Sequence, residues 1–258
     1  MSQLSPFGIQ LRAWRRRRGL SQLDLALHAG TTPRYVSFVE TGRSRPGRDL
    51  IVRLCDALDV PLRDRNVLLA AAGLSPSYPE RTLDDDALAP VHRVVSHLLT
   101  HHEPFPAWVM GKATCLRANP AANRLFPGLV GTPPEDLIER FFRPGPLREM
   151  IENWREVAHL ALGDLRSETL RNPTPERYAA LAKAEAMATS IGPTPEAWSE
   201  AVACPIFRID GQRVRTIASV LRFDNAVDVT VAELRVELMF PADDASEAFF
   251  RAHARVTP

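Results

Sequence analysis

The chain has 258 residues, of which 45% are hydrophobic and 24% charged, so it suits two modest domains or one large one and is not a wholly disordered chain. No uncharged apolar run approaches the ~20 residues that a membrane helix requires. The N-terminus has no basic stretch followed by an apolar core, so we expect no secretion signal and no membrane insertion. Three widely spaced cysteines, Cys55, Cys115 and Cys204, fit neither a disulfide framework nor a zinc finger. We therefore expect a cytoplasmic protein.

The charge is divided unevenly along the chain. Residues 1–74 hold twelve Arg, no Lys and six acidic residues, which gives a net charge of +6. Residues 75–258 hold the other twenty basic and twenty-five acidic side chains, which gives −5. A basic N-terminal part predicts a polyanionic partner for that part alone, and the guanidinium group suits phosphate and guanine edges.

Residues 5–73 read as five short helices with tight connections. Phe7, Leu11 and Trp14 have the spacing of one face of a first helix, which ends in the Arg15–Arg18 run. Ser21 has the pattern of an N-cap, with Asp24 at the acidic position of a capping box. A third helix is predicted from Thr32 as N-cap. Two further helices complete the segment: one contains Ile51, Leu54, Cys55 and Leu58, and the other opens at Pro61 and ends near Gly73.

The stretch 19–46 resembles the helix-turn-helix of the lambda-Cro/phage-repressor family, also called the XRE family. The matching features are Leu20-Ser21-Gln22, Leu25-Ala26, Ala29-Gly30-Thr31, Val36-Ser37 and Glu40-Thr41-Gly42-Arg43. The resemblance covers about the first quarter of the chain. It implies a sequence-specific transcription regulator whose partner is a double-stranded DNA operator, bound as a homodimer, with half-sites about 34 Å apart.

In such a domain the N-terminal residues of the second helix of the motif reach base edges in the major groove. We expect Arg34 to hydrogen-bond guanine, and Gln22, Arg43 and Arg45 to contact phosphates. The predicted DNA-binding residues are Gln22, Thr32, Pro33, Arg34, Ser37, Phe38, Arg43 and Arg45.

Each assignment has a structural alternative. Arg34 would otherwise lie on a solvated face, and Phe38 would cover the core or a dimer contact. The Arg15–Arg18 run is either a solvated helix end or a set of phosphate contacts. Glu40 is expected to orient a nearby arginine or to cap backbone N–H groups rather than to touch DNA.

Residues 75–87 are rich in Pro and charge and have no apolar period, so they predict a linker between a domain at 1–74 and a second domain at 88–258. Beyond it we expect a helix over 88–100, a hairpin over 107–118 and a helix from Asn119. One long helix over 146–170 and another near 174–189 follow. Strands over 202–209, 214–223 and 227–240 and a helix over 246–254 close the chain, with a β-bulge where the apolar parity changes between Val231 and Leu234.

The segment 105–126, with its Asn119-Pro120-Ala121-Ala122 run, resembles the opening of PAS domains. Together with Asn153–Ala158, the closing segment 223–243 and the N-terminal domain, it resembles the MmyB-like regulators. The resemblance implies an α+β, PAS-like domain, with an antiparallel sheet and helices over one face. It also implies an apolar pocket for a small apolar or acyl ligand such as a fatty acid.

The ligand-binding residues that we expect are Trp108, Met110, Phe126, Trp154, Tyr178 and Arg222. Each also fits an ordinary core or surface position. The alternative function for 88–258 is therefore a ligand-free module for dimerisation or partner docking.

Other chemistry finds little support in the sequence. His97, His101 and His102 have metal-ligand spacing without a companion carboxylate cluster, and Cys115 with Cys204 would make a redox pair only if the strands brought them together. No phosphate loop, nucleophile elbow or haem motif is present. We expect no enzyme activity, no cofactor and no metal.

Overall fold

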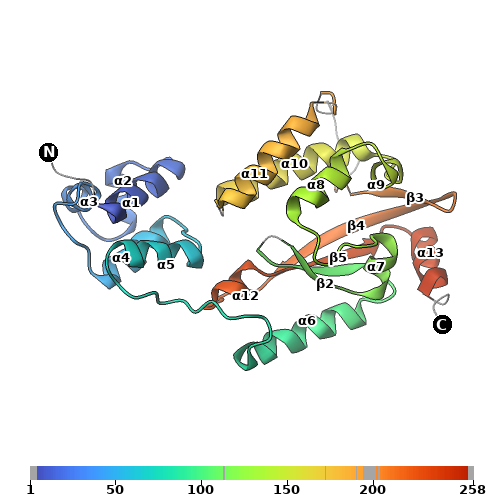
Figure 1. Ribbon diagram of the computed structural model, residues 1–258, viewed down its shortest axis with the longest axis horizontal. Helices are drawn as coiled ribbons and strands as arrows, with labels where there is room; N and C mark the ends of the chain where they lie inside the picture. The colour runs from blue at the N-terminus through green and yellow to red at the C-terminus, as the bar shows by residue number, and fades with distance from the viewer. Residues whose placement is uncertain are drawn as a thin grey trace. The chain divides into compact units, whose positions relative to one another are not determined.

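The structure is a computed structural model that describes residues 5–112, 114–171, 173–189, 191–193, 202 and 204–254. Its ribbon is shown in Figure 1. The chain divides into two compact units. The N-terminal unit comprises residues 1–81 together with 225–232, and the C-terminal unit comprises 82–224 and 233–258. No helix among the described residues is long and apolar enough to cross a membrane.

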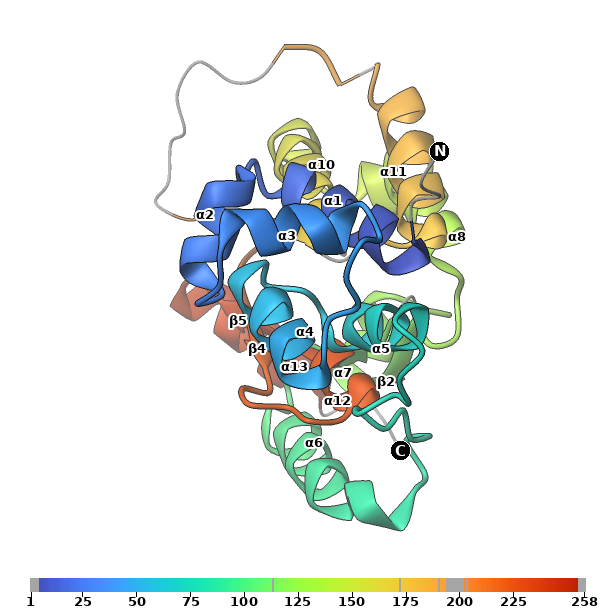
Figure 2. The ribbon, with the colours of Figure 1, turned by 90° about the vertical axis from the view of Figure 1, so that its left-hand side faces the viewer.

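The N-terminal unit is built on five helices: α1 (Pro6–Arg17), α2 (Gln22–His28), α3 (Pro33–Glu40), α4 (Arg48–Ala57) and α5 (Leu62–Ala71). Each helix contributes its apolar stripe to one core, which includes Leu11, Leu25, Val36, Leu54 and Leu68, all almost fully buried. This burial stabilises helices that are too short to persist alone in water. Figure 2 shows α2 and α3 side by side, in direct contact.

The caps predicted around α2 and α3 are confirmed. The Ser21 hydroxyl accepts a hydrogen bond from the Asp24 backbone N–H, and the Asp24 carboxylate accepts one from the Ser21 N–H. The chain leaves α2 through Gly30, whose φ of +62° is the left-handed conformation that glycine favours. Thr32 then caps α3, and Pro33 occupies its first turn. These local devices fix where α3 starts.

A segment from far along the sequence completes the N-terminal unit. Residues 225–232 connect two strands of the C-terminal sheet and carry the start of α12 (Val229–Glu233). The Val229 N–H donates to the Pro79 carbonyl at 2.8 Å, and the buried Asp228 carboxylate pairs with Arg81 at 2.9 Å. The residues that follow the five helices are therefore tied to this segment.

The C-terminal unit contains a five-stranded antiparallel sheet in the order β2-β1-β5-β4-β3. The strands are β1 (Ala107–Met110), β2 (Cys115–Ala118), β3 (Ile206–Ile209), β4 (Gln212–Arg222) and β5 (Arg235–Pro241). The predicted hairpin over 107–118 is confirmed, as is the turn at Asp210-Gly211, where both residues have positive φ.

Helices cover both faces of this sheet, which corrects the expectation of helices over one face (Figure 1). On one face Val109 and Val236 pack with Val95 and Leu99 of α6 (Ala89–His101), which follows the short helix η1 (Asp86–Leu88). The opposite face packs against a larger cluster that includes Trp154. Its helices are α8 (Pro134–Phe142), α10 (Trp154–Arg171), α11 (Pro175–Ala188) and α13 (Asp244–Ala254). The helix α7 (Pro120–Leu125) lies beside β1 and β2.

The single helix predicted over 146–170 is wrong. The chain forms α9 (Pro146–Glu149) and then breaks before α10. In the break, the Glu152 N–H donates to the Ile206 carbonyl, and the Asn153 side chain bonds the Ile206 N–H and the Cys204 carbonyl. Pairing with the start of β3 therefore replaces the helical hydrogen bonds at this point, although the apolar spacing continues through it.

The continuous strand predicted over 227–240 is also wrong, and so is its β-bulge. Residues 229–233 form α12, and β5 begins only at Arg235. The Asp228 side chain accepts hydrogen bonds from the N–H groups of Thr230 and Val231, which starts the helical turn. The change of apolar parity between Val231 and Leu234 therefore marks a helix-to-strand junction.

Candidate nucleic-acid interface and ligand-binding domain

The start of α3 is exposed. Val36 and Val39 anchor the helix in the core, while Pro33 and Arg34 lie on the outside. Thr32 is exposed as well, although its hydroxyl accepts a hydrogen bond from the Tyr35 N–H. An exposed helix tip of this kind is the geometry in which a helix-turn-helix domain reaches base edges.

Phe38 lies one turn along α3 from Arg34 and is not part of the core cluster. The Arg34 guanidinium lies 5.3 Å from the ring centroid of Phe38, and that of Arg43 lies 5.9 Å from it. Contacts of this kind between a cation and an aromatic ring are attractive. The half-buried ring of Phe38 therefore contacts two of the predicted DNA-binding arginines. Ser37, on the same helix, is half-buried as well.

The far end of α3 is held by a buried ion-pair network. Glu40, the last residue of α3, is fully buried, and Arg15 binds both of its carboxylate oxygens, at 2.7 and 3.0 Å. Arg12 donates to the same carboxylate at 3.3 Å. Burial alone would raise the pKa of Glu40, but hydrogen bonds from Arg15 and Gln22 and the charge of Arg15 hold that pKa below its ordinary value. Glu40 thus orients arginines, as its position in the motif predicted.

Gln22 belongs to this network in the structure. Its amide nitrogen donates to Glu40 at 2.8 Å, whereas the sequence predicts that it holds a DNA phosphate. One amide hydrogen and the backbone N–H groups at the start of α2 are not used in that bond, so the phosphate contact stays a prediction. The sequence did not single out Arg12, because its partner lies two helices away.

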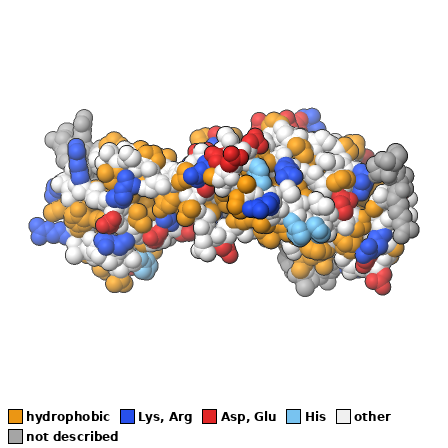
Figure 3. All heavy atoms as spheres, turned by 90° about the horizontal axis from the view of Figure 1, so that it is seen from below, with side chains coloured by type: hydrophobic (Ala, Val, Ile, Leu, Met, Phe, Trp, Pro, Cys, Tyr) orange, Lys and Arg blue, Asp and Glu red, His pale blue; other side chains and the backbone are white. Residues whose placement is uncertain are grey.

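The remaining arginines fall into two groups. Arg43 and Arg45, in the loop after α3, are exposed, and so are Arg16 and Arg17 at the end of α1. In contrast, Arg15 is used by Glu40, and Arg18 donates to the backbone carbonyls of Leu58 and Asp59 at 2.7 Å. Figure 3 shows arginine side chains, in blue, spread over the left part of the view, where the N-terminal unit lies. The predicted run of four thus divides into two structural and two exposed arginines.

In the C-terminal unit, three of the four predicted ligand-binding aromatic residues, Trp108, Phe126 and Trp154, gather in the large core cluster. The rings of Trp108 and Phe126 meet edge-on at 5.6 Å, and Phe126 meets Phe207 at 6.0 Å. Trp154 is buried, donates to the Phe141 carbonyl at 2.9 Å and carries the Arg148 guanidinium 3.6 Å from its ring. These contacts form a packed aromatic layer between the sheet and the helices.

The other three predicted ligand residues lie elsewhere. Met110 is half-buried at the end of β1, and Tyr178 on α11 is exposed. Arg222, at the end of β4, pairs with the buried Glu168 of α10. The structure thus brings Trp108, Phe126 and Trp154 into one cluster but does not place Tyr178 in it. An apolar hollow of about 300 Å³ between α7 and α13, lined in part by Leu125 and Phe249, contains none of the predicted residues.

Residues 91–252 match the family described as the MmyB-like transcription regulator ligand-binding domain. The chain belongs to the MmyB-like transcription regulators. Residues 6–68 match the family of helix-turn-helix domains. This MmyB-like chain therefore combines a helix-turn-helix domain with an MmyB-like ligand-binding domain that follows it in the sequence.

Individual relatives match part of the chain. The chain is 40% identical over 78 residues to the uncharacterized HTH-type transcriptional regulator RghRB of Bacillus subtilis (strain 168). The match covers 30% of this chain and about half (54%) of that protein. Among solved structures, the restriction-modification controller protein C.AhdI of Aeromonas hydrophila is 38% identical over 24% of this chain and 92% of its own, with a TM-score of 0.23. The clp gene regulator ClgR of C. glutamicum is 29% identical over 27% of this chain and 86% of its own, with a TM-score of 0.24.

The histidines and cysteines singled out in the sequence of this MmyB-like chain lie in packed or buried positions. The rings of His97 and His101 stack at 3.8 Å, and within the described ranges no group of three or more His, Cys, Asp or Glu side chains is placed to hold a metal. All three cysteines are buried and free. Burial raises the pKa of the Cys55 thiol to about 12 and that of Cys115 to about 11, so neither is a reactive thiolate at neutral pH.

Sequence reasoning missed the cluster around Glu168. This carboxylate on α10 contacts Arg171, Arg177 of α11 and Arg222 of β4, and Arg235 of β5 lies 3.9 Å away. Burial opposes ionisation of Glu168, but the charges of Arg222 and Arg235 hold its pKa below the ordinary value. No sequence motif signals the cluster, because its members come from four separate elements.

Proposed function

We propose that this chain is a one-component regulator that binds an operator through α3 and changes that binding when its C-terminal domain takes up a small molecule. The observation that carries the first half is the exposed start of α3, with Arg34 outside and Val36 and Val39 buried beneath it. An arginine at this position has the reach and the donor geometry for two hydrogen bonds to guanine.

The proposed interface separates reading from positioning. Arg34, with Thr32 and Pro33 beside it, contacts base edges, and Ser37 and Phe38 lie one turn behind. The exposed Arg43 and Arg45 neutralise phosphates, and Gln22 at the start of α2 fixes the register of the domain on the duplex. In this proposal the protein acts as a homodimer in the cytoplasm, with half-sites about 34 Å apart.

The second half of the proposal, ligand control, is supported by the chain segments that make up the N-terminal unit. Residues 225–232 belong to that unit, although both ends of the segment continue into β4 and β5 of the ligand-binding domain. A ligand that prefers one arrangement of this connection shifts the population of the DNA-binding state by its difference in affinity for the two states. The ligand we propose is a small apolar or acyl molecule such as a fatty acid, contacted by Trp108, Met110, Phe126, Trp154, Tyr178 and Arg222.

One observation favours a second candidate function for the C-terminal domain, namely ligand-free dimerisation or partner docking. The edge-on contacts of Phe126 with Trp108 and Phe207 fill the space between them with side chains. Native mass spectrometry of protein purified from its host separates the two functions. An adduct of lipid size supports sensing, whereas a bare homodimer supports the docking module.

The proposed function is tested by selecting bound fragments from random DNA with the full chain, with and without host lipid extract. We expect one enriched motif whose recovery changes when extract is added. Recovery of fragments without a shared motif would contradict sequence-specific binding, and a motif whose recovery ignores the extract would contradict ligand control.

A further inference from the structure

The arginine cluster around Glu168 holds more positive charge than it needs for its own carboxylate. Four guanidinium groups, those of Arg171, Arg177, Arg222 and Arg235, surround this one acidic side chain. Glu237 lies two residues after Arg235 on the same face of β5, and burial raises the pKa of its carboxyl above the ordinary value. The cluster is electrostatically suited to a second anion.

The hydrogen bonds point the same way. The Nε atoms of Arg177 and Arg235 are buried without a hydrogen-bond partner in the described structure. A buried donor without an acceptor is costly, and native proteins rarely leave one unused. Each guanidinium carries several N–H donors, whereas the carboxylate of Glu168 offers only two oxygens. An oxyanion would supply the missing acceptors.

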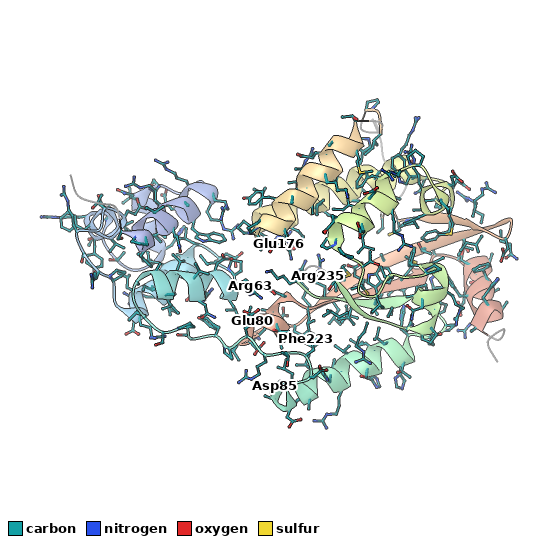
Figure 4. The ribbon with its side chains drawn as sticks, in the orientation of Figure 1. Arg63, Glu80, Asp85, Glu176, Phe223 and Arg235 are labelled. Atoms are coloured by element: carbon teal, nitrogen blue, oxygen red, sulfur yellow. The ribbon has the colours of Figure 1, made fainter. Side chains whose placement is uncertain are left out.

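The cluster is also reachable from solvent. The Arg222 side chain is 42% exposed and that of Arg235 is 21% exposed. These two arginines are direct cross-strand partners, so they present their side chains on one face of the sheet. Arg235 also pairs with Met110, and Trp108 lies two residues before Met110 on the same face. In Figure 4, Arg235 lies between the sheet and the start of α11, where Glu176 is labelled.

We propose that Arg177, Arg222 and Arg235 form a binding site for the oxyanion group of a small ligand, a carboxylate or a phosphate, and that Glu168 holds these arginines in place when the ligand is absent. Arginine suits this role because its planar fork donates two hydrogen bonds to one oxyanion. Anion binding at this site does not depend on the proposed function of the protein. Only the effect of the anion on operator binding rests on that proposed function.

The position of the site in the sequence explains how a bound anion would change operator binding. Arg222 ends β4 and Arg235 begins β5, so the two arginines border the connection that supplies residues 225–232 to the N-terminal unit. Within that unit, Asp228 of this connection is paired with Arg81. An oxyanion that binds Arg222 and Arg235 together restrains both ends of the connection and favours one of its conformations.

The test is isothermal titration calorimetry of the full chain with sodium phosphate and, separately, sodium acetate, against chloride at equal ionic strength. We expect saturable binding of one of the two anions, and the stronger response distinguishes a phosphate from a carboxylate ligand. Arg235→Gln should weaken this binding about tenfold or more, because a charge-assisted contact is lost. Arg166→Gln, which removes an exposed arginine of the same helix as Glu168, should leave it unchanged.

The variant Glu168→Gln separates an anion site from a structural ion pair. Removal of the competing carboxylate should tighten anion binding several-fold. Equal binding by the wild-type chain, Arg235→Gln and Arg166→Gln would overturn the proposal. If Arg235→Gln does not fold, Glu168→Gln decides alone: tighter binding supports the site, and unchanged or weaker binding overturns it.

Operator binding is measured on the same samples and keeps the two proposals apart. Phosphate binding that follows the variants while operator affinity stays constant would leave the site standing and remove its role in regulation. If the wild-type chain binds its operator but the arginine variants bind anions as well as the wild-type chain does, the anion site is refuted. The DNA-binding function would then be unaffected.

Discussion

Two buried carboxylates, Glu40 in the N-terminal unit and Glu168 in the C-terminal unit, are surrounded by arginines in different ways. Glu40 is fully buried, and Arg12, Arg15 and Gln22 donate to its two oxygens. Glu168 faces four guanidinium groups and leaves two buried Nε atoms without a partner. We interpret the cluster of Glu40, Arg12, Arg15 and Gln22 as a structural network that fixes the end of α3, and we call it the lock. The cluster around Glu168 is the proposed anion-binding site.

The largest effect that we expect is on the lock. Glu40→Gln should lower the free energy of unfolding of the N-terminal unit by about 3–5 kcal/mol, because it leaves Arg15 as a buried charge without its partner. Urea unfolding followed by circular dichroism measures this loss. The exposed pair of Arg166 and Glu185 provides the control, since Glu185→Gln should cost less than about 1 kcal/mol. Equal losses in both variants would show that the Glu40 cluster is not a lock.

A second prediction concerns the reading end of α3, which should be separable from the lock. Arg34→Ala should weaken operator binding by about 1–3 kcal/mol and relax sequence preference at one position, with little change in unfolding. Fluorescence anisotropy with the selected operator measures the change. Arg53→Ala removes an exposed arginine of α4 and serves as the matched control. Wild-type affinity in Arg34→Ala would remove this residue from the interface.

The pH dependence of stability tests the charge of the lock. Because the pKa of Glu40 is lower in the folded chain than its ordinary value of 4.5, this residue adds stability above that pH, and the contribution is lost as the pH falls through the folded pKa. The acid destabilisation should be smaller in Glu40→Gln than in the wild-type chain. The free energy of unfolding of both proteins is measured from about pH 7 to about pH 3, the range in which carboxylates titrate. Identical pH profiles of the wild-type chain and Glu40→Gln would contradict an ionised Glu40.

A further prediction concerns the phosphate contacts beside α3. Arg43→Gln should weaken binding to all DNA sequences alike and reduce the slope of log affinity against log salt by about 0.9. Titrations at several salt concentrations with operator and unrelated DNA measure both effects. A loss confined to the operator would instead place Arg43 on a base.

The smallest effect is expected at Phe38, whose ring contacts both Arg34 and Arg43. Phe38→Leu keeps an apolar side chain but removes the aromatic face, and should weaken operator binding by about 0.5–1 kcal/mol. In the Arg34→Ala background the same substitution should cost less. An equal cost in both backgrounds would show that Phe38 does not position Arg34.

The parts of the fold that local chemistry determines were predictable from the sequence. Ser21 and Thr32 cap the helices that they were expected to cap, because an N-cap needs only the backbone N–H groups of the next few residues. The helix expected from Asn119 also begins there, with Asn119 as its N-cap. The segment 150–153 was predicted to be helical and is not, because its hydrogen bonds go to the start of β3. A partner so distant along the chain leaves no periodic signal at the break.

The candidate sites show the same division. The exposed arginines beside α3 follow from the motif, since the motif fixes which side of the helix faces the core. The Glu168 cluster does not follow from any motif, because strand pairing alone brings Arg222 beside Arg235, and helix packing adds Arg177. Trp108 and Phe126 were expected near one another and are, but the sequence contains no measure of how fully their neighbours fill the space between them.

The central claim, that the start of α3 reads bases, is tested most directly by replacing single guanines of the selected operator with 7-deazaguanine, which lacks the N7 acceptor. The affinities of the wild-type chain and Arg34→Ala are then compared on each duplex. We predict that at one guanine the replacement weakens the wild-type chain by about 1–3 kcal/mol and leaves Arg34→Ala unaffected, because the contact is already lost. Losses of equal size in both proteins at every guanine would contradict base reading by Arg34.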